Sequence, residues 1–263
     1  MPLLKACLNG ARRPAEHPAL PVTPEQLARD AVAVREAGAD AVHLHVRDAD
    51  GADTLRPAEL AAVLTAVRAA APGLPVGVTT GAWAEPDPDA RVALIEAWTV
   101  LPDFASVNWH EAGAERVAAA LLDRGVGVEA GLWHADAVQD WLRSPLRGRC
   151  LRVLVELPDG ARAAEDATEL LGLLGTDTSG RTSGGTPVLL HGEDRSAWPV
   201  LTIAARHGLA TRIGLEDALE LPDRSPAPDN AALVRAARDL LTGPAGGPST
   251  DACPAAPPGH RLP

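Results

Sequence analysis

The stretch AVHLHVRDADG, residues 41–51, predicts a buried β-strand that runs into an acidic turn. Its first six residues are Val, Leu or Ala apart from two histidines, so neither face of the strand is suited to solvent. A segment with the apolar spacing of a helix follows from Pro57 onward. Strands that are apolar on both faces are typical of parallel sheets covered by helices, so this unit predicts an α/β fold.

The same strand-then-helix unit recurs along the chain. Helices begin at recognisable signals, such as Thr23, which can cap a helix, followed by Pro24, which suits its first turn. The eight units in 263 residues favour a (β/α)8 TIM barrel as a single domain over residues 1–242, with an open doubly wound sheet as the alternative. The predicted strands cover residues 3–9, 41–46, 75–79, 104–108, 127–132, 150–157, 187–191 and 211–215.

Two segments differ from this pattern. TDTSGRTSGGT, residues 176–186, leads from a helix to the next strand, so we interpret it as a connector on the N-terminal face of the barrel rather than a phosphate loop. Residues 243–263 are rich in Pro and Gly, and we expect an extended or disordered tail that could instead wrap around a partner subunit.

Composition narrows the classes of function. The formal net charge of −11 disfavours binding to nucleic acid or to an anionic membrane surface, so we expect small-molecule partners. The cysteines at positions 7, 150 and 253 have no CxxC spacing and indicate reduced thiols. No run approaches the roughly 18 apolar residues of a membrane span, and no secretory leader stands out, which predicts a cytoplasmic protein.

The two histidines of the opening stretch are candidate metal ligands. Residues two apart in a strand point to the same side, so His43 and His45 project together near the end of the strand where barrel active sites lie. Glu216 in TRIGLED, residues 211–217, is the candidate third ligand. Two histidines and one carboxylate suit zinc with an open position or a non-heme iron centre. The alternatives are hydrogen-bonded core histidines and acids that cap the next segment.

Five motifs together resemble the β-keto acid cleavage enzymes over about residues 3–242. The family is a zinc-dependent (β/α)8 barrel that condenses a β-keto acid with acetyl-CoA, giving acetoacetate and a new acyl-CoA. The resemblance implies zinc as cofactor, acetyl-CoA as cosubstrate and a homo-oligomer, commonly a tetramer. The motifs are ACLNGAR (6–12), EHPALPVTPEQLA (16–28), AGADAVHLHVRDADG (37–51), VTTGA (78–82) and TRIGLED (211–217).

The resemblance also implies roles for single residues. Zinc would be held by His43, His45 and Glu216. Asp217 resembles the base that deprotonates the β-keto acid, and Arg212 positions and activates it. Thr79 stands where the family has a serine that contacts the substrate carboxylate.

Four further residues are candidate substrate contacts because of their positions at the predicted strands. Asn9 and Asn108 end two strands, and His191 ends a third, where it could contact substrate or CoA or lie in solvent. Glu129 shares a strand face with two glycines and would be a buried acid. Buried acids need a partner, so Glu129 either hydrogen-bonds the substrate or a ligand histidine, or pairs with an arginine such as Arg47.

Two departures from the family pattern bear on the substrate. Arg12 occupies the place of a family glutamate soon after the first strand, so we expect a substrate with an anionic or neutral side group, unless Glu16 substitutes for that glutamate. The loop NWHE, residues 108–111, replaces smaller residues, and we expect its bulky side chains at the pocket mouth.

Two other classes of function compete with this hypothesis. A CoA-independent, metal-dependent aldolase or hydrolase could use the same ligands. The only lysine, Lys5, lies at the wrong end of its strand for the modified lysine that many barrel hydrolases use. A regulatory metal-binding barrel without activity would leave Asp217 and Arg212 unused.

Overall fold

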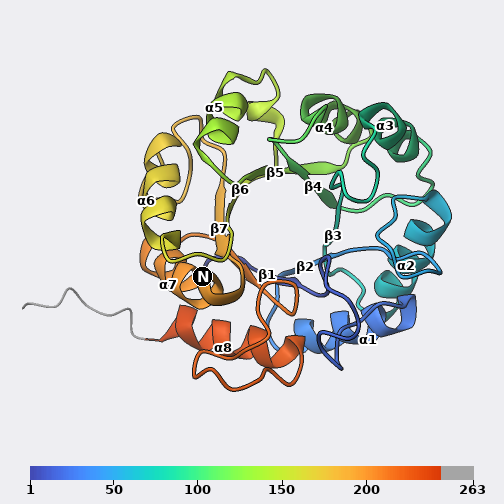
Figure 1. Ribbon diagram of the computed structural model, residues 1–263, viewed down its shortest axis with the longest axis horizontal. Helices are drawn as coiled ribbons and strands as arrows, with labels where there is room; N and C mark the ends of the chain where they lie inside the picture. The colour runs from blue at the N-terminus through green and yellow to red at the C-terminus, as the bar shows by residue number, and fades with distance from the viewer. Residues whose placement is uncertain (244–263) are drawn as a thin grey trace, which may run out of the picture.

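Eight parallel strands lie side by side in the order β7-β6-β5-β4-β3-β2-β1-β8 in the computed structural model (Figure 1), which describes residues 1–243. A parallel bridge between Leu189 and Ala210 joins β7 to β8, so the ring is closed. The predicted single-domain (β/α)8 barrel is therefore confirmed, and the predicted tail lies outside the described residues beyond Gly243. The strands are β1 Leu4–Cys7, β2 Ala41–Leu44, β3 Val76–Thr79, β4 Phe104–Asn108, β5 Gly127–Leu132, β6 Arg152–Leu157, β7 Val188–Gly192 and β8 Thr211–Ile213.

Eight α-helices surround the strands (Figure 1). Thr23 caps the first by accepting a hydrogen bond from the Gln26 backbone N–H, as its sequence signal predicts, and Asp229 caps the last in the same way through the Ala232 N–H. The helices are α1 Pro24–Glu36, α2 Pro57–Ala70, α3 Pro88–Glu96, α4 Ala114–Asp123, α5 Ala135–Arg143, α6 Ala163–Leu173, α7 Ala197–His207 and α8 Asn230–Thr242, with short 3-10 helices at Arg147–Arg149 and Asp194–Ser196.

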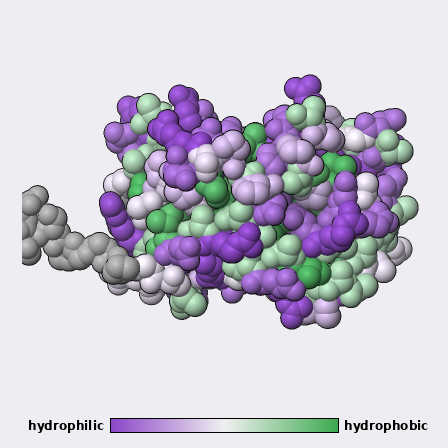
Figure 2. Space-filling model, turned by 90° about the horizontal axis from the view of Figure 1, so that it is seen from below, coloured by the Kyte–Doolittle hydropathy of each residue, from purple (hydrophilic) through white to green (hydrophobic). Residues whose placement is uncertain are grey.

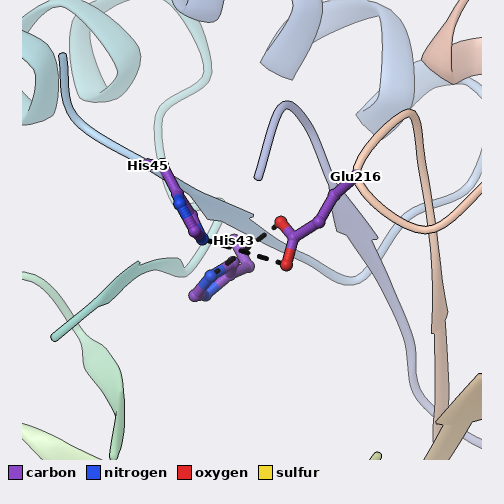
Figure 3. Close-up of side chains that lie close together, drawn as sticks. All are labelled: His43, His45 and Glu216. Carbon is purple, nitrogen blue, oxygen red and sulfur yellow. Dashed lines mark ion pairs between the residues drawn. The ribbon is translucent and has the colours of Figure 1, made fainter. Parts of the chain in front are cut away.

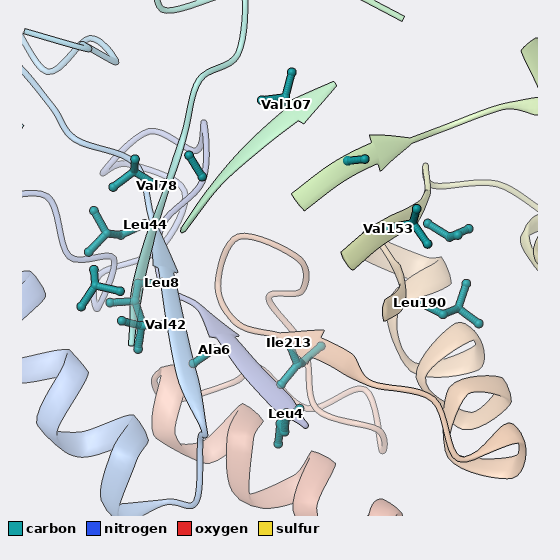
Figure 4. Packing of buried hydrophobic residues seen from close by; sticks show 14 of the residues in the cluster. Leu4, Ala6, Leu8, Val42, Leu44, Val78, Val107, Val153, Leu190 and Ile213 are labelled. Atoms are coloured by element: carbon teal, nitrogen blue, oxygen red, sulfur yellow. The ribbon is translucent and has the colours of Figure 1, made fainter. Parts of the chain in front are cut away.

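The core lies between the strands and the helices. Side chains alternate along a strand, so Val42 and Leu44 face the helices while His43 faces the barrel interior. Apolar residues of this outward-facing kind from several strands pack together (Figure 4) and are almost fully buried. This layer fixes the direction of the alternate, inward-facing residues, which include those of the candidate site.

Charged side chains pair inside the barrel near the beginnings of the strands, which we call the lower interior. Lys5 donates a hydrogen bond to Glu129, and both side chains are fully buried. Arg152 lies 3.3 Å from the other oxygen of Glu129, and the Lys5 ammonium lies 5.4 Å from the centre of the Phe104 ring. This ion cluster fills the interior of the barrel near the beginnings of the strands, whereas the cavity at the metal ligands lies near their ends.

Two further sequence predictions concern the surface. Residues 176–186 connect α6 to β7, as predicted, and Asp177 orders the turn by accepting hydrogen bonds from Ser179 and Arg181. No helix within residues 1–243 is long and apolar enough to span a membrane. The side of the barrel in Figure 2 carries polar and apolar residues intermixed. The cytoplasmic location and the tetramer stay predictions.

Candidate metal centre and active site

Three side chains from the first and last parts of the barrel meet at the ends of the strands (Figure 3). His43 Nε2 lies 4.0 Å from one carboxylate oxygen of Glu216, and His45 Nε2 lies 3.9 Å from the other. These distances are too long for hydrogen bonds. Two ligands that each lie about 2.0–2.2 Å from one ion can be up to roughly 4.4 Å apart, so the spacing suits a shared metal ion.

The surroundings of these three residues also fit a cation. Both histidines are buried, and the Glu216 side chain is 11% exposed with its Oε2 atom lacking a hydrogen-bond partner within the described chain. An unpaired buried carboxylate oxygen is costly unless a cation binds it. Burial, and then the charge of Lys5, lower the pKa of His43 well below its usual value, so its imidazole is neutral and able to act as a ligand.

Asp53 fixes the orientation of His45. Its carboxylate lies 2.8 Å from His45 Nδ1, accepts a hydrogen bond of 2.7 Å from the Trp83 indole, and pairs with Arg47 at 2.7 Å. Burial raises the pKa of Asp53, but the contacts with His45, and then with Arg47 and Trp83, outweigh this effect. The net pKa is lowered, so the carboxylate is ionised. A carboxylate on the far nitrogen of a histidine ligand is the usual outer support of a metal site. The sequence showed no motif for Asp53.

Asn9 supports the same histidine through its backbone. The Asn9 amide accepts from the His45 N–H at 2.8 Å and donates to the His45 carbonyl at 2.9 Å. It thereby replaces the strand pairing beyond Leu44, which explains why β2 ends two residues earlier than predicted. Asn9 is fully buried and is not part of the cavity wall. Its observed role is to position His45, and a contact with the substrate stays a prediction.

Arg212 links the two acids of the TRIGLED motif. Its Nη2 donates to Glu216 at 2.9 Å and to Asp217 at 2.7 Å, and its Nε donates to His191 Nδ1 at 3.0 Å. Burial raises the pKa of Asp217, and the charge of Arg212 works in the opposite direction. Asp217 is fully buried and bonded to Arg212, which lines the cavity, but it is not itself part of the cavity wall. His191 is fully buried, bonded to Arg212, and is not part of the cavity wall, and its contact with substrate or CoA stays a prediction.

Glycines allow the first and last strands to approach each other closely. A Cβ atom on Gly214 would lie 1.9 Å from the backbone oxygen of Cys7, and one on Gly10 would lie 2.4 Å from the Glu216 side chain. Gly10 also has a positive φ of 55°, which favours glycine. The glycines of the NGAR and RIGLED motifs are therefore required by the position of Glu216.

A cavity of about 400 Å³ opens above the metal ligands. Thr79 and Asn108, two of the predicted substrate contacts, lie in its wall. Of the NWHE loop only Asn108 lines the cavity, because Trp109 packs in the core and Glu111 binds Arg91 and the Asn108 amide. The exposed His110 lies with its ring 5.0 Å from that of Trp133, a residue of the cavity wall. The expectation of bulky side chains from this loop at the pocket mouth is therefore wrong for Trp109 and stays a prediction for His110.

Glu129 lies away from this cavity. It is bound to Lys5 and Arg152 in the lower interior, below the metal ligands. Sequence periodicity indicated correctly that Glu129 faces the interior, but not how deep it lies. The suggested partner Arg47 is also incorrect, because Arg47 pairs with Asp53.

Two acids that the sequence analysis missed line the cavity opposite the histidines. Glu156 is near the end of β6 and Glu193 directly follows β7. Burial raises the pKa of Glu156, but the hydrogen bond and charge of His191 outweigh this effect, so that the pKa falls to about 2. Burial and then the charge of Glu156 raise the pKa of Glu193 to about 9. The two carboxyl groups therefore share one proton at neutral pH.

Comparison with known proteins places the chain in a family. The sequence model of the beta-keto acid cleavage enzyme family matches residues 3–251. The chain belongs to this family. The β-keto acid cleavage assignment agrees with the resemblance carried by the five motifs.

Relatives of known name share this assignment. The chain is 23% identical to the 3-keto-5-aminohexanoate cleavage enzyme of Acetoanaerobium sticklandii, over 88% of both chains. It is 36% identical to the enzyme of that name from Fusobacterium nucleatum, over 30% of this chain and 29% of the other. It is 41% identical to the 3-oxoadipate:acetyl-CoA acetyltransferase of Cupriavidus necator, over 26% of this chain and 24% of that one.

A solved structure shares the fold. The ternary complex of ObcA with a C4-CoA adduct and oxalate superposes with a TM-score of 0.66 at 19% identity. The match covers 86% of this chain and 64% of ObcA. At this identity the likeness concerns the barrel alone.

Proposed function

We propose that this protein condenses a β-keto acid with acetyl-CoA, releasing acetoacetate and a new acyl-CoA, with zinc held by His43, His45 and Glu216. The observation that carries the proposal is the meeting of these three side chains beside the buried Arg212 and Asp217 pair. The family assignment and the acetyltransferase name of one relative support the use of acetyl-CoA.

The donor set suits a Lewis-acid metal. Zinc bound there would stabilise negative charge on the keto oxygen of a β-keto acid. The protein's own contribution is to aim the His45 imidazole through its contact with Asp53 and to keep the His43 imidazole neutral by burying it. A dry, preorganised site strengthens such electrostatic stabilisation.

Asp217 is the proposed base. Arg212 holds its Oδ1, whereas its Oδ2 has no hydrogen-bond partner within residues 1–243 and is the atom that can accept a proton. The proton comes from the carbon between the keto and carboxylate groups. Arg212 keeps Asp217 in place and stabilises its ionised form.

The remaining steps balance without another reactant. The substrate carbanion attacks the thioester carbonyl of acetyl-CoA, a carbon–carbon bond forms, and the CoA thiolate leaves. The thiolate then adds to the original keto carbon, whose bond to the central carbon breaks. Acyl-CoA is released, and the proton held by Asp217 returns to the carbanion to give acetoacetate.

The test is product analysis with defined metal content. Zinc-loaded protein is incubated with acetyl-CoA and several β-keto acids, and acyl-CoA and acetoacetate are measured by mass spectrometry. We expect both products in equal amounts. Absence of any acyl-CoA from protein with confirmed metal would overturn the proposal in favour of a CoA-independent aldolase or hydrolase.

A further inference from the structure

Asn230, the first residue of α8, is a fully buried polar residue that the proposed reaction does not use. Buried polar side chains need hydrogen-bond partners, and at a helix start the usual partner is the N–H of the first turn. Here Asp229 has that role, because its carboxylate accepts the hydrogen bond from the Ala232 N–H. The Asn230 side chain is therefore available to bind other parts of the barrel.

The Asn230 amide connects the first and last strands just beyond their paired residues. Its Oδ1 accepts a hydrogen bond of 2.6 Å from the Leu215 N–H, and its Nδ2 donates one of 2.8 Å to the Leu8 carbonyl. The regular pairing of β1 with β8 ends at Ala6 and Ile213, so it includes neither of these residues. Asn230 thus continues the connection of the two strands where the backbone ladder has stopped.

A third hydrogen bond fixes the orientation of this amide. Nδ2 also donates to Asp30 Oδ2 on α1 at 2.6 Å, and α1 lies beside α8 (Figure 1). Nδ2 therefore faces two acceptors while Oδ1 faces a donor, and the opposite orientation would bring two N–H donors together. Both N–H groups and the oxygen of the amide are bonded, and no other side chain of this size offers two donors and an acceptor.

Both backbone partners of Asn230 are linked to residues of the metal centre. Leu215 directly precedes Glu216 in the chain. The Leu8 N–H donates a hydrogen bond of 3.0 Å to the His43 carbonyl. One buried amide is therefore one residue away from the carboxylate ligand and is connected to a histidine ligand through the backbone of Leu8.

Glycine at position 214 brings the chain that follows β8 within reach of this amide. A Cβ atom on Gly214 would lie 1.9 Å from the Cys7 carbonyl oxygen and 2.8 Å from Asn230 Oδ1. A side chain at this position would push the backbone away from both groups. The segment that carries Glu216 is thus packed directly against β1 on one side and Asn230 on the other.

We propose that Asn230 is a positioning residue of the metal centre, because its side chain sets the spacing between the segment that carries Glu216 and the strands that carry the histidines. Asn230 is not part of the cavity wall, so it acts through these backbone segments. The inference rests on the proposed function, since it takes His43, His45 and Glu216 as the metal ligands. Ligand distances of about 2.0–2.2 Å tolerate little displacement of one ligand, so loss of the amide bridge should weaken metal binding.

The first experiment compares metal affinity with stability. Zinc affinity is measured by competition with a chelator of known affinity, and the melting temperature by calorimetry. Asn230→Asp keeps the size of the side chain and its acceptor for Leu215 but loses both donors. We expect zinc affinity to fall about 10- to 100-fold, as for loss of an outer support. Asn230→Ala loses all three hydrogen bonds and should bind zinc at least as weakly.

Leu233→Ala is the matched control on the same helix. Leu233 is apolar and fully buried, so its truncation should lower the melting temperature by creating a cavity and leave zinc affinity unchanged. If Asn230 served stability alone, affinity would follow the melting temperature in all three variants. That result, or unchanged affinity in Asn230→Asp, would overturn the inference. Asn230→Asp, which preserves the shape of the side chain, keeps the test available if Asn230→Ala does not fold.

Hydrogen exchange of the metal-free protein gives a readout that needs no metal. The Leu8 N–H, bonded to the His43 carbonyl, is the probe, and the Val153 N–H on β6, across the barrel, is the reference. The ratio of their exchange rates should rise about tenfold in Asn230→Asp, because the opening is local. Leu233→Ala should leave the ratio unchanged. An unchanged ratio in Asn230→Asp would overturn the inference.

These measurements separate the inference from the proposed function. Zinc binding without acyl-CoA from any β-keto acid would overturn the reaction, and the affinities of the variants would still decide the role of Asn230. If the original protein bound no zinc, the proposed function would fail. The exchange ratio would then decide whether Asn230 holds the ends of the two strands together.

Discussion

The two sides of the barrel mouth are built differently. On the side of β1, β2 and β8, Asp53 holds His45 and Arg212 holds Glu216, while His43 is buried. On the side of β6 and β7, Glu156 and Glu193 face the cavity without an ion-pairing arginine or lysine among the described residues. The first side has ligands held by other side chains, as reaction chemistry requires, whereas the second leaves its carboxyl groups facing the cavity.

The largest expected effect comes from removing a metal ligand. His43→Ala leaves one imidazole and one carboxylate, so metal should be lost on dialysis, with affinity falling by more than the roughly 10- to 100-fold that loss of an outer support costs. Metal content measured by mass spectrometry checks this. If the variant retained all of its metal, His43 would not be a metal ligand, and the side of β1, β2 and β8 would not be the metal-binding side of the barrel mouth.

Asp217→Asn should reduce turnover while the metal stays bound. Loss of a general base costs about 10²- to 10⁴-fold in kcat. Glu220→Gln, an exposed acid in the same loop, is the matched control. Steady-state kinetics with metal analysis checks the prediction, and unaltered turnover would assign the base to another group, Glu193 being the first to examine.

Asp53→Asn should weaken metal binding by about 10- to 100-fold, because His45 loses its outer carboxylate. Competition with a chelator of known affinity measures the change. Asp50→Asn in the same turn is exposed and should behave as the original protein does. Equal affinities for both variants would mean that burial alone orients His45.

The smallest effect concerns stability on the β6 and β7 side. The pKa of Glu193 is about 9 in the folded protein, above the ordinary value of 4.5. Below pH 4.5 the group is protonated in both the folded and the unfolded state and does not affect the free energy of unfolding. As the pH rises from 4.5 to 9, the unfolded state loses this proton first, so the folded state becomes progressively less stable. Glu193→Gln should therefore raise the melting temperature relative to the original protein, and this gain should grow from pH 5 to pH 9. A gain that is constant with pH would contradict the shared proton.

The residues on the β2 and β8 side of the barrel mouth could be predicted from the sequence, because they lie in two short motifs, HLHVRD and TRIGLED. The alternation of HLH places two imidazoles on one face, and apolar strands followed by capped helices reveal the barrel. Asp53, Glu156 and Glu193 were missed because each is a single acid near a strand end, and only folding brings them beside partners from other strands. For Asn9, Glu129 and His191 the face was predicted but not the depth, which depends on the stagger of the strands.

The position of β1 between β2 and β8 also has a consequence for how the chain is made. The two imidazoles leave the ribosome early, whereas the carboxylate of Glu216 that completes their site is synthesised only after all eight strands. An incomplete chain thus has no complete metal site. A metal ion that needs all three ligands would therefore bind only after ring closure, and its binding would favour molecules in which the last strand has docked against the first.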